Sequence, residues 1–183
     1  MEPLKALKAL NEMLLETLTA ISPEMITQIM YFLNGAAVRM LPGYTKSEIT
    51  SFNFEYRHEW LSIVCFGSDT RGVSITETHT ILYKELDEYL AQSAKVMDEL
   101  EELAESFEGE TEEWEMQLEE YEEEKYELYD SWFEACWREA QQLTQNSTPA
   151  YFSIDELDFG IALHTSEMIE IRKSLPNMRY YIH

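Results

Sequence analysis

The feature that most constrains this chain is a pair of apolar heptad patterns in its second half. In each pattern the residues recur alternately four and three positions apart, which is the a/d seam of packed α-helices. The first pattern consists of Leu82, Leu86, Tyr89, Ser93, Val96, Leu100, Leu103 and Phe107. The second consists of Trp114, Leu118, Tyr121, Lys125, Leu128, Trp132 and Ala135. Because Glu108-Gly109-Glu110 separates the two, the spacing predicts a long antiparallel helical hairpin, or arm, over residues 82–145.

The sequence before this hairpin predicts helices followed by strands. One helical face carries Leu4, Leu7, Leu10, Leu14, Leu18 and Ile21. Ser22-Pro23-Glu24 has the residues of a new helix start, so we expect two helices within residues 1–35, ended by Gly35. Residues 49–79 are rich in β-branched and aromatic side chains, and Phe52, Phe54 and Tyr56 alternate with polar residues. That period of two predicts an antiparallel meander of about three strands.

Residues 150–183 predict a mixed segment that packs on this sheet. Ser153-Ile154-Asp155-Glu156 matches the S-x-x-E capping box and predicts a short helix. We further expect a strand over 159–164, a helix over 166–175 and a final strand over 178–182. The fold class is therefore α+β, with N-terminal helices, a small antiparallel sheet and a long acidic antiparallel helical hairpin in a single domain, 1–183.

Negative charge is concentrated on the predicted hairpin. The chain has 36 acidic and 13 basic side chains, a formal net charge of −23. Between Lys84 and Glu139 there are 22 acidic and four basic residues, and between Asp98 and Glu127 there are 16 acidic residues and one base. Such a field repels nucleic acids and anionic membranes and speeds encounter with basic surfaces. We therefore expect a basic protein partner, with no direct binding to nucleic acid or membrane.

The charge pattern has a cost that favours a binding role. Like charges four residues apart on a helix are mildly destabilising, and Glu101 with Glu105 and Glu115 with Glu119 form such pairs. A helix selected for stability alone would interleave lysine with glutamate. A solvated helix face is the alternative interpretation, because glutamate is a good helix former and runs of charge usually face water.

No catalytic or cofactor motif is found in the sequence. Phosphate-binding glycine loops and the G-x-S-x-G elbow are absent, and Glu55-Tyr56-Arg57-His58 is a single E-x-x-H where a di-iron site needs two. Cys65 and Cys136 lie among apolar residues, which favours small buried side chains over a nucleophile. We expect no enzyme activity, no cofactor and no metal. The apolar core of a signal peptide is missing from the first residues, so we expect a cytoplasmic protein.

The aromatic residues of the second heptad segment allow two interpretations. Tyr126, Tyr129 and Phe133 fall off the predicted seam. They can pack on the sheet, or they can anchor a partner within the acidic surface.

The acidic stretch from Asp98 to Glu127 resembles, as a class, acidic inhibitor proteins such as anti-CRISPR proteins, antirestriction DNA mimics and immunity proteins. The resemblance implies that carboxylates replace nucleic-acid phosphates in a basic channel, most simply that of a Cas9-type effector. The alternatives are an immunity protein against a bacterial nuclease toxin and an acidic chaperone or scaffold for basic proteins. Either a monomer or a homodimer fits the heptads. The candidate partner-binding residues are Glu105, Glu108, Glu112, Glu113, Glu115 and Glu119.

Overall fold

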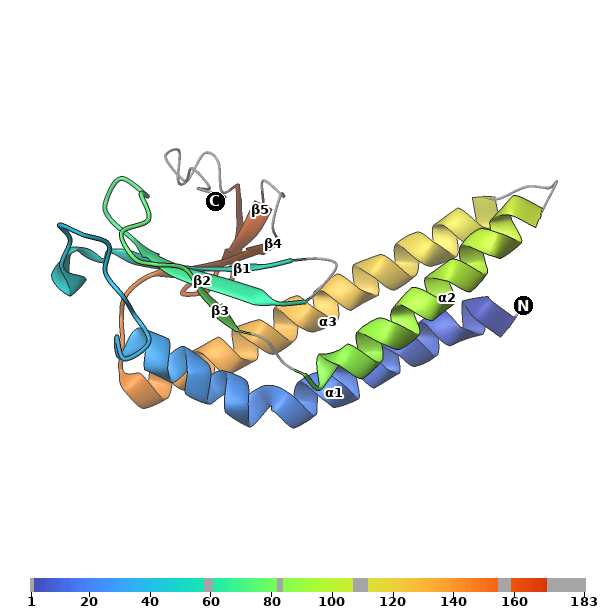
Figure 1. Ribbon diagram of the computed structural model, residues 1–183, viewed down its shortest axis with the longest axis horizontal. Coiled ribbons are helices and arrows are strands. Elements are labelled where there is room, and N and C mark those ends of the chain that lie inside the picture. Colours follow the sequence, from blue (N-terminus) through green and yellow to red (C-terminus); the bar gives the residue numbers. More distant parts are fainter. Residues whose placement is uncertain (1, 58–60, 82–83, 107–111, 155–158, 171–183) are drawn as a thin grey trace. The chain divides into compact units, whose positions relative to one another are not determined.

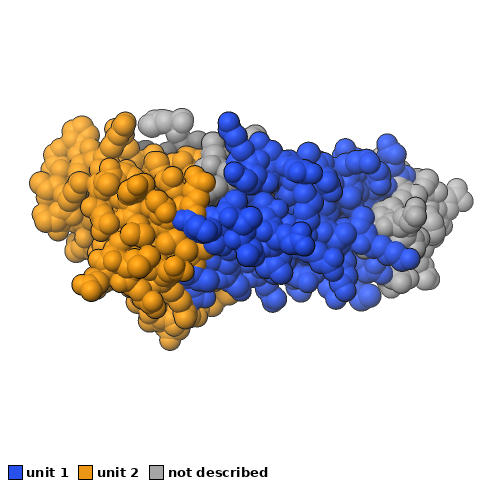
Figure 2. Space-filling model, turned by 90° about the horizontal axis from the view of Figure 1, so that it is seen from below, with its two compact units in different colours: residues 1–23, 83–135 blue, residues 24–82, 136–183 orange. Residues whose placement is uncertain are grey.

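A computed structural model of the chain describes residues 2–57, 61–81, 84–106, 112–154 and 159–170. Within these residues it has three long α-helices, one short 3₁₀ helix (Lys46–Glu48) and a six-stranded mixed sheet (Figure 1). The expected α+β class is therefore confirmed. The chain divides into two compact units, which Figure 2 colours separately. Unit 1 comprises Met1–Pro23 and Tyr83–Ala135, and unit 2 comprises Glu24–Leu82 and Cys136–His183.

Helix α1 spans Glu2–Leu33, so the expected break into two helices at residues 22–24 is wrong. Proline inside a helix costs about 3 kcal/mol because its amide cannot hydrogen-bond. Ile21, Met25 and Ile29 are buried on both sides of Pro23, each at 4% exposure or less. Burying one such side chain contributes about 1.5–3 kcal/mol. The free energy gained by burying these three side chains therefore exceeds the cost of proline inside the helix. The predicted stop is confirmed: α1 ends just before Gly35, which has a φ of +73°.

Unit 1 contains α2 (Leu86–Ser106), α3 (Glu112–Thr144 up to Ala135) and the first part of α1. The expected two-helix antiparallel hairpin is wrong, because α1 also packs on α3. Trp132 Nε1 donates to Ser22 Oγ at 2.9 Å, across 110 residues of sequence. On α2, the hydroxyl of Tyr89 shares a hydrogen bond of 3.0 Å with that of Tyr121. Unit 1 is therefore a three-helix assembly and not a free two-helix arm.

The buried stripe of α3 gives the physical reason for this third helix. Within unit 1 its members are Tyr121, Lys125, Tyr129, Trp132 and Phe133. This stripe is wider than an a/d seam, and a single partner helix would leave part of it in water. Leu128 and Ala135, which the heptad placed on the seam, are half-buried and exposed, whereas Tyr129 and Phe133 are fully buried. Those two aromatic side chains therefore pack in the core.

Unit 2 is built on the sheet, whose strand order is β3-β2-β1-β4-β5-β6. The strands are β1 (Ser51–Tyr56), β2 (Ile63–Ser68), β3 (His79–Ile81), β4 (Ala150–Ile154), β5 (Phe159–Ala162) and β6 (Glu167–Glu170). Strand β1 pairs in parallel with β4, and the other pairs are antiparallel. The expected small antiparallel sheet is therefore wrong in both size and type. The three strands expected over residues 49–79 are present as β1, β2 and β3, but they form one half of a mixed six-stranded sheet.

The centre of the sheet is buried on both faces. All six residues of β1 are buried, including Asn53, whose Nδ2 donates to Ser68 Oγ at 2.9 Å. The ring of Phe32, near the end of α1, meets Phe52 and Phe54 edge-on at centroid distances of 5.0 and 5.7 Å. The alternating pattern of β1 therefore does not mark one solvated face, because side chains on both faces of this strand are buried.

The last segment contains strands where helices were expected. Residues 167–170 form strand β6 where a helix was expected over 166–175. Ser153 and Ile154 belong to strand β4, and the rest of the short helix predicted there lies outside the described residues. The strand expected over 159–164 is confirmed as β5. The prediction for 178–182 lies outside the described residues. Pairing of β4 with the distant strand β1 and of β6 with the neighbouring strand β5 decides these conformations, and the helix patterns contain neither pairing.

Candidate protein-binding surface

Most of the net negative charge belongs to one of the two compact units. Unit 1 has 24 acidic and five basic residues, a net charge of −19, whereas unit 2 has 12 acidic and eight basic residues, a net charge of −4. Even with every basic side chain of unit 1 paired, 19 carboxylates would stay without a cation. One of those bases, Lys95, pairs with Glu99 at 3.7 Å. The three-helix unit is therefore the candidate surface for a basic partner.

The predicted partner-binding residues cluster where α2 ends and α3 begins. Glu105 belongs to the last turn of α2, and Glu112, Glu113 and Glu115 belong to the first turns of α3. Glu119 is exposed on α3. The side chains of the other four, and the whole of Glu108, lie outside the described part of the chain. Their roles in binding therefore stay predictions.

A groove lies between α1 and α3 in unit 1. It has a volume of about 610 Å³. Helix α1 contributes Leu7, Lys8 and Asn11 to its lining, and α3 contributes Met116, Gln117, Glu120, Tyr121, Glu123, Glu124 and Glu127. We call this the α1–α3 groove. It has four carboxylates and one basic side chain, so its potential is strongly negative.

Asn11 is the buried polar residue of this groove, at 3% exposure. Its Nδ2 donates to Glu124 Oε2 at 2.8 Å and to the backbone oxygen of Tyr121 at 3.3 Å. Its Oδ1 is buried and accepts no hydrogen bond from the described residues. An unpaired buried acceptor costs about 1–3 kcal/mol. The two donated bonds tie α1 to α3, but they leave Oδ1 unexplained.

Other polar groups lie between α2 and α3. Tyr121 OH interacts with Tyr89 OH at 3.0 Å and with Ser93 Oγ at 3.3 Å. Burial, followed by the hydrogen bond with Tyr121, raises the pKa of Tyr89, so the Tyr89 hydroxyl stays neutral. Lys125, one turn further along α3, is only 8% exposed, and burial lowers its pKa while Glu122 opposes the shift. The cluster consists of hydrogen-bonded hydroxyls beside one poorly solvated ammonium, an arrangement that suits alignment of the packed helices better than acid–base chemistry.

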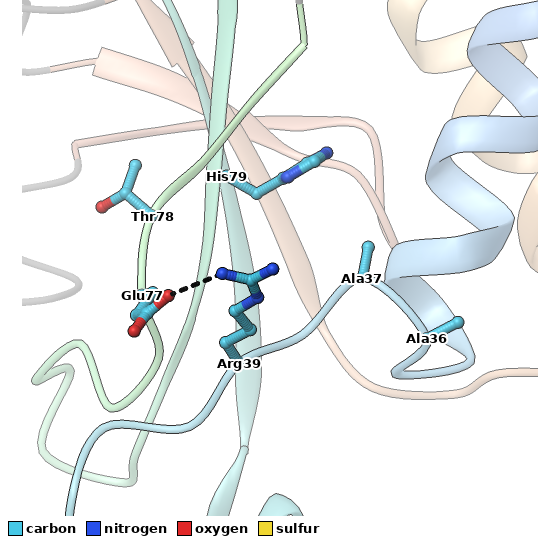
Figure 3. Close-up of a pocket in the computed structure, with 6 residues that line it drawn as sticks. All are labelled: Ala36, Ala37, Arg39, Glu77, Thr78 and His79. Carbon is cyan, nitrogen blue, oxygen red and sulfur yellow. Dashed lines mark ion pairs between the residues drawn. The ribbon is translucent and has the colours of Figure 1, made fainter.

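A hollow in unit 2 has a different character. Arg39 and Glu77 face one another across it with an ion pair of 3.9 Å (Figure 3). Ala36, Ala37, Thr78 and His79 complete its lining, and its volume is about 350 Å³. The two charged side chains are 84% and 57% exposed, so the pair is screened and weak. This hollow is small, polar and nearly neutral.

Neither cysteine has the surroundings of a nucleophile. Cys65 is fully buried, its Sγ donates to the backbone oxygen of His79 at 3.4 Å, and burial raises the pKa of its thiol to about 12. Cys136 is also buried, at 3% exposure. Reactive thiols need the opposite environment, with partial exposure and a lowered pKa. The prediction of two buried structural cysteines is confirmed.

The lining of the α1–α3 groove was missed by reasoning from the sequence. Met116, Glu120, Glu123 and Glu127 recur on one face of α3 at spacings of four, three and four. That spacing was available, but the heptad assigned the neighbouring face to a partner helix. The contribution of α1 could not be read, because Asn11 and Glu124 are 113 residues apart.

Within the described residues, no three or more histidine, cysteine, aspartate and glutamate side chains are grouped to hold a metal ion. In the same part of the chain, no helix has both the length and the apolar composition that a membrane crossing requires.

No protein-family model, curated protein sequence or solved structure matches the chain.

Proposed function

We propose that this protein is an inhibitor that binds a basic nucleic-acid-binding surface on another protein and occupies it in place of nucleic acid. The first candidate target is a Cas9-type effector, which would make the protein an anti-CRISPR. The single observation that carries the proposal is the segregation of charge, with −19 of the net −23 on the three-helix unit. Net charge needed only for solubility has no reason to be confined to one unit.

The charge density of α3 supports mimicry of a phosphate backbone. Glu119–Glu127 contains six carboxylates and Lys125, a net charge of −5 over nine residues. At about 1.5 Å per residue these span about 14 Å, or about one charge per 2.8 Å. A single nucleic-acid strand carries about one charge per 3.4 Å, and duplex DNA about one per 1.7 Å. The distance per charge along Glu119–Glu127 lies between these two values. A channel that neutralises phosphates would therefore also attract this face of α3.

The proposal can be tested first by capture. The purified protein, and a variant with Glu108, Glu112, Glu113 and Glu115 changed to lysine, are used to capture proteins from host lysate at moderate salt. We expect one dominant nucleic-acid-processing protein with the wild type and loss of that protein with the variant. A diffuse set of basic proteins, lost at moderate salt, would refute the inhibitor function and favour a generic acidic chaperone.

A competition assay then tests the mechanism. Nucleic-acid binding by the captured protein, or by a purified guide-loaded Cas9-type effector, is measured as the acidic protein is added. A phosphate mimic must be competitive, so the concentration that gives half-inhibition should rise in proportion to the nucleic acid present. A half-inhibition concentration that does not change with nucleic acid would rule out mimicry. Capture of a secreted nuclease toxin would instead identify an immunity protein.

A further inference from the structure

We propose that the outer edge of strand β6 (Glu167–Glu170) docks an extended segment of a protein partner, which adds one more strand to the sheet. The segment carries a basic residue at each end of a short apolar centre. This edge lies in unit 2, so the inference goes beyond the proposed function and does not depend on the acidic three-helix unit. It adds a second binding surface of different chemistry.

The position of β6 in the sheet is the first argument. It is a terminal strand, and among the described strands it pairs only with β5. Alternate residues of an edge strand direct their N–H and C=O groups away from the sheet, where a further strand can bind them. The strand at the other end, β3, has three residues, and its one large apolar side chain, Ile81, is buried. Strand β6 is therefore the edge that also offers exposed apolar side chains.

An exposed apolar patch beside this edge is the second argument. Met168 on β6 is 70% exposed, and Phe159 on β5 is 56% exposed. Met168 is directly opposite Ile161 on β5, and Phe159 is two residues from Ile161 in the same strand. Directly opposed residues, and residues two apart in one strand, lie on the same face of a sheet. Met168, Ile161 and Phe159 therefore form one continuous apolar patch.

This patch continues the apolar face that is buried at the centre of the sheet. Ile161 is opposite Phe152 on β4, and Phe152 is opposite Phe54 on β1. The ring of Phe54 meets that of Phe32, in α1, at a centroid distance of 5.7 Å. Phe54 and Phe152 are fully buried, whereas Met168 on the same face is exposed. The apolar face therefore extends past the buried part of the sheet, and a strand added beside β6 would cover its outer margin.

The charges that flank Met168 indicate what the added strand carries. Glu167 and Glu170 are the first and last residues of β6, and Met168 and Ile169 lie between them. Opposite charges on directly opposed residues of neighbouring strands stabilise the pairing. A partner strand with the pattern basic, apolar, apolar, basic places a cation opposite each glutamate and an apolar side chain opposite Met168 and Ile169. The pattern reads the same in both directions, so it fits a parallel or an antiparallel strand.

The same charges disfavour a second copy of the chain as the occupant. An antiparallel pair of β6 strands that aligns all four residues places Glu167 of each copy opposite Glu170 of the other. Like charges directly opposed in a sheet are destabilising, and each chain also has a net charge of −23. The occupant is therefore a different protein with a basic extended segment.

The inference is tested with a blocked octapeptide whose centre reads lysine, phenylalanine, valine, lysine, flanked on each side by threonine and then glycine. Binding to the full-length, isotopically labelled protein is followed by NMR at physiological salt. We expect saturable shifts of the Met168 methyl group and of the β6 backbone amides. Absence of shifts in β6 would overturn the inference.

N-methylated peptides test whether the segment binds as a strand. Two versions of the octapeptide carry N-methyl groups on either the odd-numbered or the even-numbered amides, and both keep every side chain and charge. Only one version should lose binding, because a strand directs alternate amides toward its neighbour. Equal affinity of the two versions would overturn strand pairing.

Matched variants separate the edge from the rest of the surface. Met168→Thr and Leu143→Thr each remove one exposed apolar side chain from unit 2, and Leu143 belongs to α3, outside the sheet. We expect Met168→Thr to weaken the peptide about threefold, as for loss of a cross-strand contact, and Leu143→Thr to weaken it less than about 1.5-fold. Equal effects of the two substitutions would overturn the site.

Reversal of one charge gives a test with a rescue. Glu167→Lys should weaken the peptide about fivefold, or about 1 kcal/mol, because it replaces opposed unlike charges with like charges. A peptide with glutamate in place of both lysines should then bind to Glu167→Lys more tightly than to the wild type. Failure of this rescue would overturn the assigned pairing.

The remaining outcomes separate this inference from the proposed function. The variant with Glu108, Glu112, Glu113 and Glu115 changed to lysine alters unit 1 alone, and physiological salt screens general attraction to charge. Its affinity for the octapeptide should therefore change less than about twofold. Loss of peptide binding in this variant would overturn the edge and leave the inhibitor proposal standing. Dimerisation of the wild type that Met168→Thr abolishes, measured by analytical ultracentrifugation, would assign the edge to a second copy and would also overturn the inference.

Discussion

Substitution of Lys125 should stabilise the protein, whereas most substitutions destabilise a folded protein. It is 8% exposed on the buried stripe of α3, burial lowers its pKa, and it forms no hydrogen bond or ion pair within the described residues. Methionine has a similar length and apolar stem, so it can fill the same space. Lys125→Met should therefore stabilise the protein.

The expected gain follows from two opposing contributions. Burial disfavours the charged form of Lys125, and for a fully buried polar group without a hydrogen bond this cost is about 1–3 kcal/mol, so the substitution removes at most that much. It also removes the attraction to Glu122, three residues away on the same helix, which is a few tenths of a kcal/mol. We therefore expect the free energy of unfolding to rise by about 1–2 kcal/mol. For a chain of this length that is a rise in Tm of about 2–8 °C.

Lys95→Met is the matched control, because it makes the same change in net charge at an exposed position. Lys95 is 76% exposed and pairs with Glu99, so its loss should destabilise by no more than a few tenths of a kcal/mol. Both variants are compared with the wild type by urea denaturation and by thermal unfolding, followed by circular dichroism. The reasoning is refuted if Lys125→Met lowers the free energy of unfolding, or changes it no more than Lys95→Met does. Either result would mean that solvent or a hydrogen-bond acceptor already stabilises the Lys125 ammonium.

The pH dependence gives a second, independent check on Lys125. Because its folded pKa lies below the usual value of 10.5, the destabilising effect of its charge is complete below the folded pKa. The folded state binds fewer protons than the unfolded state between the two pKa values, so stability rises with pH in that window. The advantage of Lys125→Met should accordingly shrink as pH rises toward 10.5. An advantage that grows with pH would contradict the assigned sign.

Three further predictions address the fold, the thiols and the binding surface. Leu14→Ala should destabilise the protein by about 3–5 kcal/mol, whereas Leu15→Ala should cost less than about 1 kcal/mol, because Leu14 is fully buried and Leu15 is 49% exposed; similar values from denaturation would contradict the placement of α1. With a thiol pKa of about 12, Cys65 at pH 8 is thiolate in about one molecule in 10⁴, so thiol reagents should label it only after denaturation, and rapid labelling of the native protein would disprove its burial. Partner affinity should fall steeply between 0.1 and 1 M salt as the screening length drops from about 10 to 3 Å, and a salt-independent affinity in titration calorimetry would point to the apolar surface instead.

The sequence by itself determined the features that depend on near neighbours along the chain. The α+β class, the leucine face of α1, its stop at Gly35 and the burial of both cysteines follow from local spacing and residue type. The concentration of acidic charge also follows, since it is a property of composition along one stretch. These predictions succeed because helix periodicity and glycine geometry act within a few residues.

Only the tertiary structure decided which elements share a surface. Pro23 stays inside α1 because buried residues on both sides outweigh its lost hydrogen bond. Strand β4 pairs with β1, about 100 residues earlier in the chain, and β6 extends the resulting sheet by pairing with β5. The α1–α3 groove belongs to the same kind of feature. Asn11 and Glu124 are far apart in sequence and meet only because the wide apolar stripe of α3 requires a third helix. Burial of that stripe is a property of the assembled unit, and no local pattern contains it.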